Sequence, residues 1–233
     1  MTKQTMKDLP KLWELNDVWH VLTDEEKEYI DDNCTVVNFR KNEIIHKEGD
    51  IPTHMMMLAK GKVRVYKEGI GNKPQIIRML KPCDFFSYRS MLANERSNTS
   101  VSAFEASTIY MVRKDVFLDI IQRNSRLCYQ FLVMMARDLG DSDRRTVNLT
   151  QKHVRGRLAE ALLSLKQNYG LDEDGATISM YMSREDVANL SNMTTANAIR
   201  TLANFVDEDI IALDGRKIKI LDEEQLIRIS RLG

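Results

Sequence analysis

The chain lacks an excess of charge of either sign, a cysteine framework and a long apolar run. Lys plus Arg and Asp plus Glu both number 34, so the whole chain gives no electrostatic argument for nucleic-acid binding. Its 3 cysteines, Cys34, Cys83 and Cys128, are widely spaced and form no C-x-x-C pair. A disulfide framework, a zinc site and an iron–sulfur site are therefore not expected.

Two further absences bear on location and chemistry. Nowhere do 18 apolar residues run together, and the first 25 residues contain no continuous apolar segment. We therefore expect a cytoplasmic protein with no membrane partner. No phosphate-binding loop, metal-spaced cluster or nucleophile–base pairing is visible in the sequence. We expect no catalytic residue, metal, cofactor or enzymatic activity.

With 233 residues, of which 43% are apolar, the chain is long enough for two buried cores. The order of its patterns predicts an α+β protein in three parts. A β-roll with an N-terminal helix occupies residues 1–124, a long helix residues 125–150, and a winged helix-turn-helix domain residues 151–233.

The first part begins with a helical pattern from Leu9 to Asn33. Thr23 and Glu26 form a capping box, and Tyr29 and Ile30 are the residues expected to face inward. Between residues 35 and 112, short apolar runs alternate with turn residues and no helical period competes. This texture predicts a compact antiparallel roll or barrel.

Residues Ser125 to about Leu149 predict one long helix, preceded by a helical turn or two at Phe117–Gln122. Residues Leu127, Phe131 and Met134 form one apolar face of the long helix. The other face has the spacing of a two-stranded coiled coil and predicts a dimer seam of Cys128, Leu132, Met135, Leu139, Ser142, Thr146 and Leu149. The alternative is that both faces are buried within one chain.

The third part contains four further signals. Arg155–Tyr169 predicts an amphipathic helix, Thr177–Met180 a short strand, and Asp222–Leu232 a small capped helix. The pair Asp214-Gly215, between alternating apolar residues, predicts a hairpin with a type I′ turn.

Between these signals, Met182–Phe205 predicts two short helices joined by a three-residue turn. Ser183 and Asp186 form a capping box, Asn192 suits a left-handed turn residue, and Thr194 is a second N-cap. In the second helix, one face carries the apolar residues Ala198, Leu202 and Phe205. The opposite face has no carboxylate and consists of Thr195, Ala196, Ile199, Arg200 and Ala203.

Such a face can lie against a phosphate backbone without repulsion, so the segment predicts a DNA-binding helix-turn-helix. An ordinary helical hairpin is the alternative. After Thr150 the chain carries 11 basic and 13 acidic residues, a net charge of −2, which argues mildly against DNA binding. Most of these acids fall in three clusters, Asp172–Asp174, Asp207–Asp209 and Asp222–Glu224, away from the predicted reading face.

Several short strings match a known family: EGD at Glu48–Asp50, KGKVRVY at Lys60–Tyr66, DFF at Asp84–Phe86 and ARDLG at Ala136–Gly140. In this order, with a roll, a long helix and a winged helix-turn-helix, the chain closely resembles the cyclic-AMP receptor protein and fumarate-nitrate regulator (Crp/Fnr) family. The resemblance implies a homodimeric transcription regulator that binds double-stranded DNA, contacts the transcription machinery and senses a signal, such as a small-molecule effector, in its roll.

Nucleotide-binding members of that family place Gly-Glu just after the Asp-Phe stretch and Arg-Ser or Arg-Thr further along. Here Ser87-Tyr88 stands at the first position, so the carboxylate that would accept from a ribose hydroxyl is missing. Arg96-Ser97 recurs near the second position with a one-residue shift, and Ser97-Asn98 fits the ungapped register. We expect a signal other than cyclic AMP and a candidate effector pocket of Phe86, Ser87, Tyr88, Arg89, Arg96, Ser97, Asn98 and Thr99.

The sequence also bears on three other kinds of sensor: an iron–sulfur cluster, a haem and another small molecule. Nothing before Cys34 resembles the N-terminal cysteine cluster of the redox-sensing branch. A haem would need an axial ligand such as His20, His46, His54 or a cysteine, and each histidine is better interpreted as a surface or loop residue. Another small molecule in the roll, or a closed pocket, remains open.

On the DNA side, the family's reading helix often carries an Arg-Glu pair and then an Arg. Here only Arg200 is kept, and it can bond guanine O6 and N7, worth about 1 to 3 kcal/mol of discrimination. Methyl groups next to it suit thymine methyls and predict an A·T-leaning half-site. The predicted DNA-binding residues are Ser183, Arg184, Thr194, Thr195, Ala196, Asn197, Ile199 and Arg200. Of these, Arg184, Thr194 and Asn197 are expected to position phosphates.

A second class of function competes with this hypothesis. The chain could be a small-molecule sensor that acts through a protein partner, with the winged helix as the interaction module. The net negative charge of the third part is the observation that favours this alternative.

Overall fold

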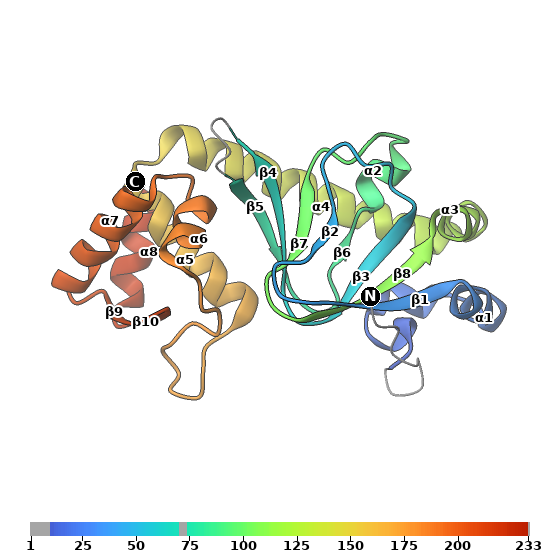
Figure 1. Cartoon of the computed structure of the whole chain (residues 1–233), viewed down its shortest axis with the longest axis horizontal. Helices are drawn as coiled ribbons and strands as arrows, with labels where there is room; N and C mark the ends of the chain where they lie inside the picture. The colour runs from blue at the N-terminus through green and yellow to red at the C-terminus, as the bar shows by residue number, and fades with distance from the viewer. Residues whose placement is uncertain (1–9, 70–73, 233) are drawn as a thin grey trace. The chain divides into compact units, whose positions relative to one another are not determined.

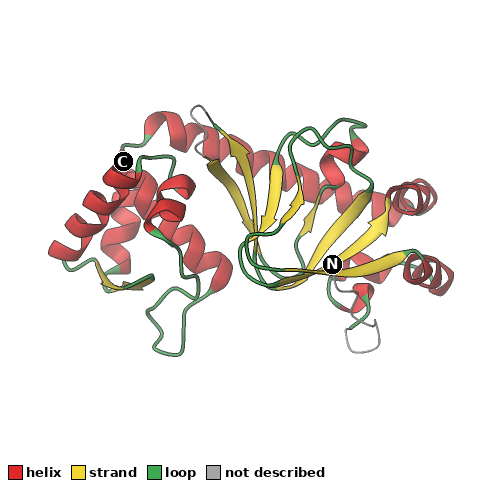
Figure 2. Cartoon of the chain, in the orientation of Figure 1, coloured by secondary structure: helices red, strands yellow, loops and turns green. Residues whose placement is uncertain are grey.

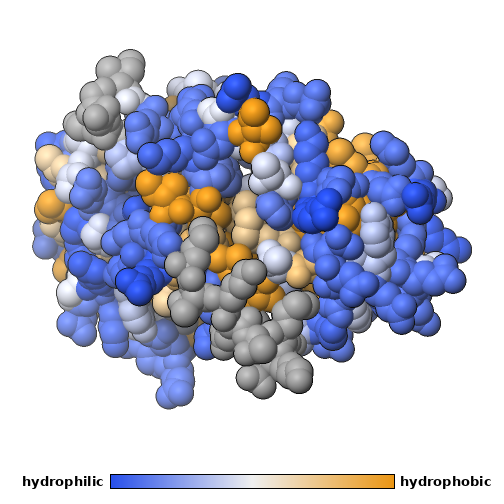
Figure 3. Space-filling view, turned by 45° about the vertical axis from the view of Figure 1, so that its right-hand side comes forward, coloured by the Kyte–Doolittle hydropathy of each residue, from blue (hydrophilic) through white to orange (hydrophobic). Residues whose placement is uncertain are grey.

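The computed structural model describes residues 10–69 and 74–232, so Leu9, the first residue of the predicted N-terminal helix, lies outside the described part. The chain divides into two compact units, residues 1–67 with 77–140 and residues 68–76 with 141–233 (Figure 1). Strands dominate the first unit and helices the second (Figure 2). Hydrophilic residues cover most of the face drawn in Figure 3, with smaller hydrophobic areas between them.

Two four-stranded sheets form the roll, with strand orders β1-β8-β3-β6 and β2-β7-β4-β5. Among the described residues, β1 with β8, β3 with β8, β3 with β6, β2 with β7 and β4 with β7 pair antiparallel, which confirms the predicted roll. The strands are β1 (Cys34–Phe39), β2 (Ile44–His46), β3 (His54–Lys60), β4 (Val63–Glu68), β5 (Pro74–Leu80), β6 (Phe85–Phe86), β7 (Ser100–Ala103) and β8 (Ser107–Arg113). A short helix, α2 (Tyr88–Leu92), lies in the region that was predicted to contain only strands.

The roll is filled by apolar side chains from both sheets. On β4, Val63 and Val65 are buried while Arg64 between them is half-buried, because successive side chains of a strand point to opposite faces. The turn before β4 requires glycine: Gly61 has a φ of 94°, and a Cβ there would lie 2.5 Å from the carbonyl oxygen of Ala106. The interior cluster comprises Phe39, Met56, Leu58, Val63, Val65, Leu80, Phe86, Val101, Ala103 and Ile109.

The N-terminal segment is less helical than predicted. It forms two 3₁₀ turns, η2 (Leu12–Glu14) and η3 (Asp17–Val21), and then α1 (Asp24–Asp32). The capping box at Thr23 and Glu26 is confirmed, with Oγ1 of Thr23 accepting from the Glu26 amide at 3.2 Å. Ile30 is buried as expected, but Tyr29 is 41% exposed, so its inward orientation was wrong.

A second core lies between the first sheet and the helices α1, α3 (Lys114–Arg123) and α4 (Ser125–Gln151). At its centre Phe131 of α4 is 2% exposed. Its ring meets four other rings edge-on at centroid distances of 5.0 to 6.2 Å, those of Phe117, Phe85, Tyr88 and Trp19. Edge-to-face contacts of this kind add to the free energy gained by burying the rings.

The long helix is confirmed, and its two faces differ. Leu127 and Phe131 are buried on the face that packs into the first unit, and Met134 is partly buried there. On the predicted seam, Leu132 and Leu139 are 62% and 64% exposed. Cys128, Ser142 and Thr146 are also exposed, whereas Met135 and Leu149 are half-buried.

The second unit contains α5 (Val154–Tyr169), α6 (Arg184–Leu190), α7 (Thr195–Asp207), the hairpin β9 (Ile211–Asp214) and β10 (Lys217–Ile220), and α8 (Glu223–Leu232). The predicted helices 155–169 and 222–232 are confirmed within a residue. The predicted strand Thr177–Met180 is wrong. This segment makes isolated bridges to two different segments, Thr177 to Lys219 and Ile178 to Leu171, so it forms no continuous ladder with either.

The hairpin is confirmed, but its turn differs from the prediction. Asp214 pairs with Lys217, so the two central residues are Gly215 and Arg216. Only Gly215 has a positive φ, of 55°. A type I′ turn needs a positive φ at both central residues, so this turn is of another type.

Replacing Phe131 with alanine should destabilise the first unit by about 3 to 5 kcal/mol, because it removes a buried ring and leaves a cavity. Urea unfolding followed by tryptophan fluorescence reports on this unit alone, since the 2 tryptophans, Trp13 and Trp19, both lie in it. The matched control is Arg126→Ala, an exposed position on the same helix. An unfolding midpoint for Phe131→Ala equal to that of the control would contradict the central place of this ring.

Candidate nucleic-acid interface and effector region

The first helix of the candidate interface, α6, begins at the predicted cap. Oγ of Ser183 accepts from the amide of Asp186 at 3.0 Å and donates to the carboxylate of that residue at 2.6 Å. Val187 and Ala188 are buried and Leu190 is half-buried. Because the Ser183 hydroxyl is engaged in the cap, its first role is to start the helix.

The turn between α6 and α7 has four residues, 191–194, rather than the predicted three. Asn192 has a φ of 50°, which confirms the left-handed turn position. Oγ1 of Thr194 accepts from the amide of Asn197 at 3.2 Å and caps α7. The helix-turn-helix therefore has the local chemistry that the sequence predicted at both helix starts and in the turn.

Helix α7 is divided into a buried and an exposed face. Ala198, Leu202 and Phe205 are at most 1% exposed. On the opposite face, Ile199 is 50% exposed even though it is large and apolar. The residues Thr195, Ala196, Arg200 and Ala203 are exposed with it. This face presents methyl groups and one guanidinium, and no carboxylate.

Arg184 has a structural contact that the sequence did not reveal. Its Nη2 donates to the carbonyl oxygen of Gly215 at 2.9 Å, so it connects α6 to the turn of the hairpin. The hairpin is thereby held beside the helix-turn-helix as a wing.

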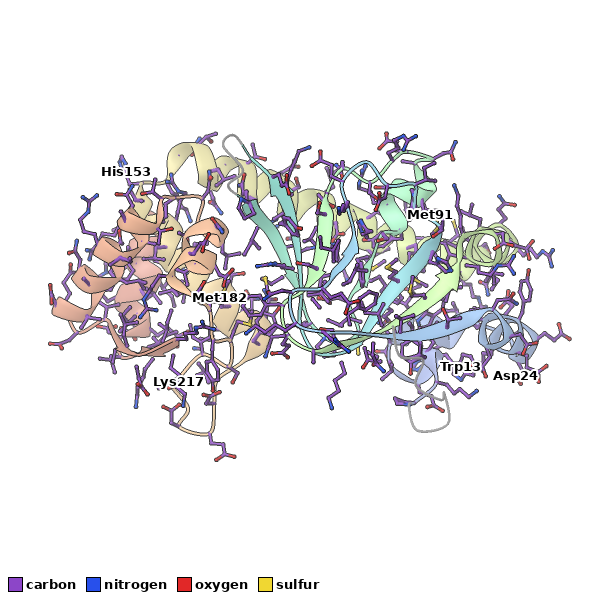
Figure 4. The ribbon with its side chains drawn as sticks, in the orientation of Figure 1. Trp13, Asp24, Met91, His153, Met182 and Lys217 are labelled. Carbon is purple, nitrogen blue, oxygen red and sulfur yellow. The ribbon has the colours of Figure 1, made fainter. Side chains whose placement is uncertain are left out.

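The wing adds basic residues that the sequence analysis did not include in the interface. Arg216 and Lys217 are exposed at its turn, and Lys219 is exposed on the same strand as Lys217. Figure 4 labels Lys217 at the wing, and its Nζ lies 5.6 Å from the ring centroid of Tyr181. The alternating pattern Lys-Ile-Lys-Ile was the available signal, because it places both lysines on the solvent side of a two-stranded hairpin.

Arg157 of α5 is a second residue that the sequence analysis missed. Its Nε and Nη2 donate to the carbonyl oxygens of Ser191 and Asn192, both at 3.2 Å. Its Nη1 donates to the carbonyl oxygen of Lys152 at 3.0 Å. One side chain thus bonds to two carbonyls of the interhelical turn. No sequence spacing indicates a contact across 34 or 35 residues.

The acidic loop before α6 is used within its own unit. Asp172 accepts from Tyr181 and Ser179, and these bonds lower the pKa of its carboxyl. Asp174 accepts from the amides of Thr177 and Ala176, which also lowers its pKa. The negative charge of the domain therefore includes carboxylates that organise a loop.

In the candidate effector region, Tyr88 turns toward the second core. Its ring is 2% exposed against Phe131, and its hydroxyl donates to Asp138 of α4 at 2.7 Å. Arg78 donates to the same carboxylate oxygen at 2.7 Å. Burial and the bond to Asp138 raise the pKa of Tyr88. The residue at the position of the family's glutamate is thus engaged elsewhere.

Ser87 adopts the backbone conformation that glycine would supply, with a φ of 66°. Its Oγ shares a hydrogen bond with Nε2 of His46 at 2.9 Å and lies 3.9 Å from the sulfur of Met56. His46 and His54, expected at the surface or in loops, lie in β2 and β3 and are half-buried. Burial lowers the pKa of His46, which favours its neutral form.

The other predicted pocket residues are spread over separate contacts. Nη1 of Arg96 donates to the carbonyl oxygen of Gly49 at 2.8 Å. Arg89 is exposed and pairs with Glu95 at 3.3 Å. Phe86 is buried inside the roll, Ser97 is buried, Thr99 is half-buried and Asn98 is exposed. The structure brings Ser87 to His46 and Arg96 to the loop of Gly49, but it takes Tyr88 away from both.

Within residues 10–69 and 74–232, no group of three or more His, Cys, Asp or Glu side chains is placed to hold a metal ion. No helix in this described part combines the length and apolar character needed to cross a bilayer.

Comparison with known proteins agrees with this architecture. Residues 36–124 match the family model of the cyclic nucleotide-binding domain, and residues 156–229 match that of the Crp-like helix-turn-helix domain. These two domains, with the long helix between them, define the class of two-domain DNA-binding transcription regulators. The chain belongs to the Crp/Fnr family within it. That family consists of transcription regulators rather than enzymes.

Sequence identity to individual relatives is low, but the similarity extends over most of each chain. The CRP-like cAMP-activated global transcriptional regulator of Mycobacterium tuberculosis is 25% identical, over 84% of this chain and 88% of its own. The nitrogen fixation regulation protein FixK of Bradyrhizobium diazoefficiens is 26% identical, over 80% of this chain and 78% of its own. The solved structure of FixK2 from Bradyrhizobium japonicum has a TM-score of 0.75, at 21% identity and over 84% of this chain and 96% of that one.

Replacing Arg157 with alanine should loosen the interhelical turn, because the carbonyls of Ser191 and Asn192 lose a charged donor. Hydrogen exchange at the Ser191 and Met193 amides should accelerate about tenfold or more, as expected for the loss of a charge-assisted hydrogen bond. Arg155→Ala is the control, since this arginine of the same helix pairs with Glu208 instead. Equal exchange in the two variants would show that Arg157 does not hold the turn.

Proposed function

We propose that the chain is a cytoplasmic homodimer that binds a specific double-stranded DNA sequence through α7 and responds to a signal other than cyclic AMP. The observation that carries this proposal is the exposed face of α7. It is methyl-rich and free of carboxylates, and it has one guanidinium, while the opposite face of the same helix is fully buried. The roll, the long helix and the winged helix-turn-helix are its three functional parts.

In this proposal, α7 enters the major groove. Arg200 bonds guanine O6 and N7, and the methyl groups of Thr195, Ala196 and Ile199 contact thymine methyls. Thr194 and Asn197 lie at the start of α7, where helix amides and dipole favour a phosphate. Arg216 and Lys217 of the wing add phosphate contacts. Arg184 contributes by holding the wing, and Ser183 by starting α6.

Dimerisation is proposed through the seam face of α4. Leu132 and Leu139 lie two turns apart and are both more than half exposed, although the other face of the same helix is buried. Large apolar side chains repeated at this spacing are typical of a helix that pairs with another helix. A two-fold dimer presents two copies of α7 to a two-fold-related DNA site.

A signal other than cyclic AMP is supported by the contacts of the effector region. The carboxylate expected at a ribose is replaced by Tyr88, which is buried and bonded to Asp138. Arg96 donates to the Gly49 carbonyl through Nη1, and its remaining guanidinium donors do not replace the missing carboxylate. The residues in place therefore do not fit a cyclic nucleotide in the family's manner. The regulator would act on the transcription machinery from its DNA site.

DNA affinity measured by fluorescence anisotropy on duplexes selected from genomic fragments tests the proposal. Affinity should fall steeply as salt rises, because bound phosphates release counterions. Arg200→Ala should weaken binding by about 1 to 3 kcal/mol, the worth of a bidentate guanine contact. Arg231→Ala, which removes the same charge from an exposed position on α8, is the control.

Cyclic AMP should leave the affinity unchanged. Binding that stays at background at low salt, with and without cyclic AMP, would reject the DNA-binding proposal. It would favour the alternative, a sensor that acts through a protein partner.

Replacing both Leu132 and Leu139 with glutamate should convert the dimer to a monomer, because it places four charges in an apolar seam. Light scattering should then report the mass of one 27.0 kDa chain instead of two. Arg137→Glu changes the charge of the chain by the same amount at an exposed position off the seam, and it should remain dimeric. A wild-type chain that is monomeric at micromolar concentration would contradict the proposed seam.

A further inference from the structure

Asp138 lies on α4 where the roll-facing side of the helix meets the proposed seam. Phe131, one heptad earlier, is buried in the first unit, and Leu139, the next residue, is exposed on the seam. With Leu132 and Leu139 at heptad position a, Asp138 occupies position g, which flanks the seam of a coiled coil. A charge at this position therefore belongs to the first unit and to the seam at the same time.

The roll brings a cation to this carboxylate. Nη1 of Arg78, on β5, donates to Oδ2 of Asp138 at 2.7 Å. The two side chains are 35% and 38% exposed, so the ion pair lies at the edge of the unit rather than inside its core. The Tyr88 hydroxyl donates to the same oxygen at 2.7 Å and fixes the orientation of the carboxylate from a second side.

The heptad register places a second carboxylate opposite this one in a dimer. In a parallel two-stranded coiled coil, a residue at position g lies beside the partner's residue at position e, five residues further along. Counted from the same leucines, position e is Asp143, which is exposed on α4. A parallel seam would thus oppose Asp138 and Asp143 of the partner subunit, twice in a two-fold dimer. Like charges in such positions disfavour association.

We propose that Arg78 is a dimerisation residue that bridges these two carboxylates, neutralising Asp138 and bonding Asp143 of the partner subunit across the seam. This inference rests on the proposed dimer, and the partner is a second copy of the same chain. A guanidinium has five N–H donors in a planar fork. One of them bonds Asp138, so others remain for a second carboxylate. The interface then includes the roll as well as α4.

The dissociation constant of the full-length dimer, measured by sedimentation equilibrium, tests the inference. Arg78→Gln should raise the Kd about tenfold, because each of two sites loses an ion pair and leaves two carboxylates opposed. The matched control is Arg113→Gln. It removes the same charge from an ion pair in the first unit, with Asp115, that involves no residue of α4. Urea unfolding checks that both variants are folded.

Asp143→Asn gives the sharper readout, because its effect should change sign with the residue at position 78. In the wild type it should weaken the dimer about threefold, since Arg78 loses an acceptor. In the Arg78→Gln chain it should strengthen the dimer about threefold, since it removes the opposed charge. Both effects should shrink in about 1 M salt, where exposed charges are screened. Asp143 is exposed, so its replacement leaves the core intact.

The outcomes separate this inference from the dimer on which it rests. A wild-type chain that stays monomeric would overturn the proposed seam itself. A wild-type dimer would be retained, and the role of Arg78 overturned, if Arg78→Gln and Arg113→Gln had the same Kd. An effect of Asp143→Asn that is the same in both chains would also overturn it. If Arg78→Gln did not fold, an unchanged Kd for Asp143→Asn in the wild type would decide against the bridge.

Discussion

The packing of one face of α4 around Phe131 is the constraint on which the first unit depends. Four aromatic rings converge on this side chain, and they come from the N-terminal segment, β6, α2 and α3. By burying Leu127 and Phe131, the chain determines which face of α4 is left exposed. The same packing places the Tyr88 ring against Phe131 instead of in the candidate effector region, and the Tyr88 hydroxyl donates a hydrogen bond to Asp138. Core packing, the proposed dimer seam and the candidate effector region are thus linked through one helix.

A similar division organises the second unit. Ala198, Leu202 and Phe205 anchor α7 in its core, so the helix has one orientation within the unit and one exposed face. Contacts from other segments then complete the winged helix-turn-helix, with Arg157 holding the interhelical turn and Arg184 holding the wing. Both arginines bond to backbone carbonyls. In this unit, basic residues therefore stabilise the arrangement of the helices and the wing, as well as contributing positive charge.

The charge balance of the second unit is less unfavourable to DNA than its net value of −2 indicates. Asp172 and Asp174 accept hydrogen bonds within their own loop, and Glu208 pairs with Arg155. In contrast, Arg200 is exposed on α7, and Arg216 and Lys217 are exposed at the wing. Association with a polyanion depends on where exposed charges lie, so the placement of these residues matters more than their sum.

The sequence by itself determined the antiparallel roll, the long helix, the caps of α6 and α7 and the left-handed Asn192, because these depend on local periodicity, capping chemistry and backbone preference. It also separated the two faces of α4 and of α7. It could not determine that Tyr29 faces solvent, that Tyr88 enters the core, that residues 177–180 form no strand, or that Arg157 and Arg184 bond to distant carbonyls. Those outcomes depend on which segments meet in three dimensions. Only the tertiary structure determines which ring is buried in a core and which distant carbonyl lies within hydrogen-bond distance of a donor.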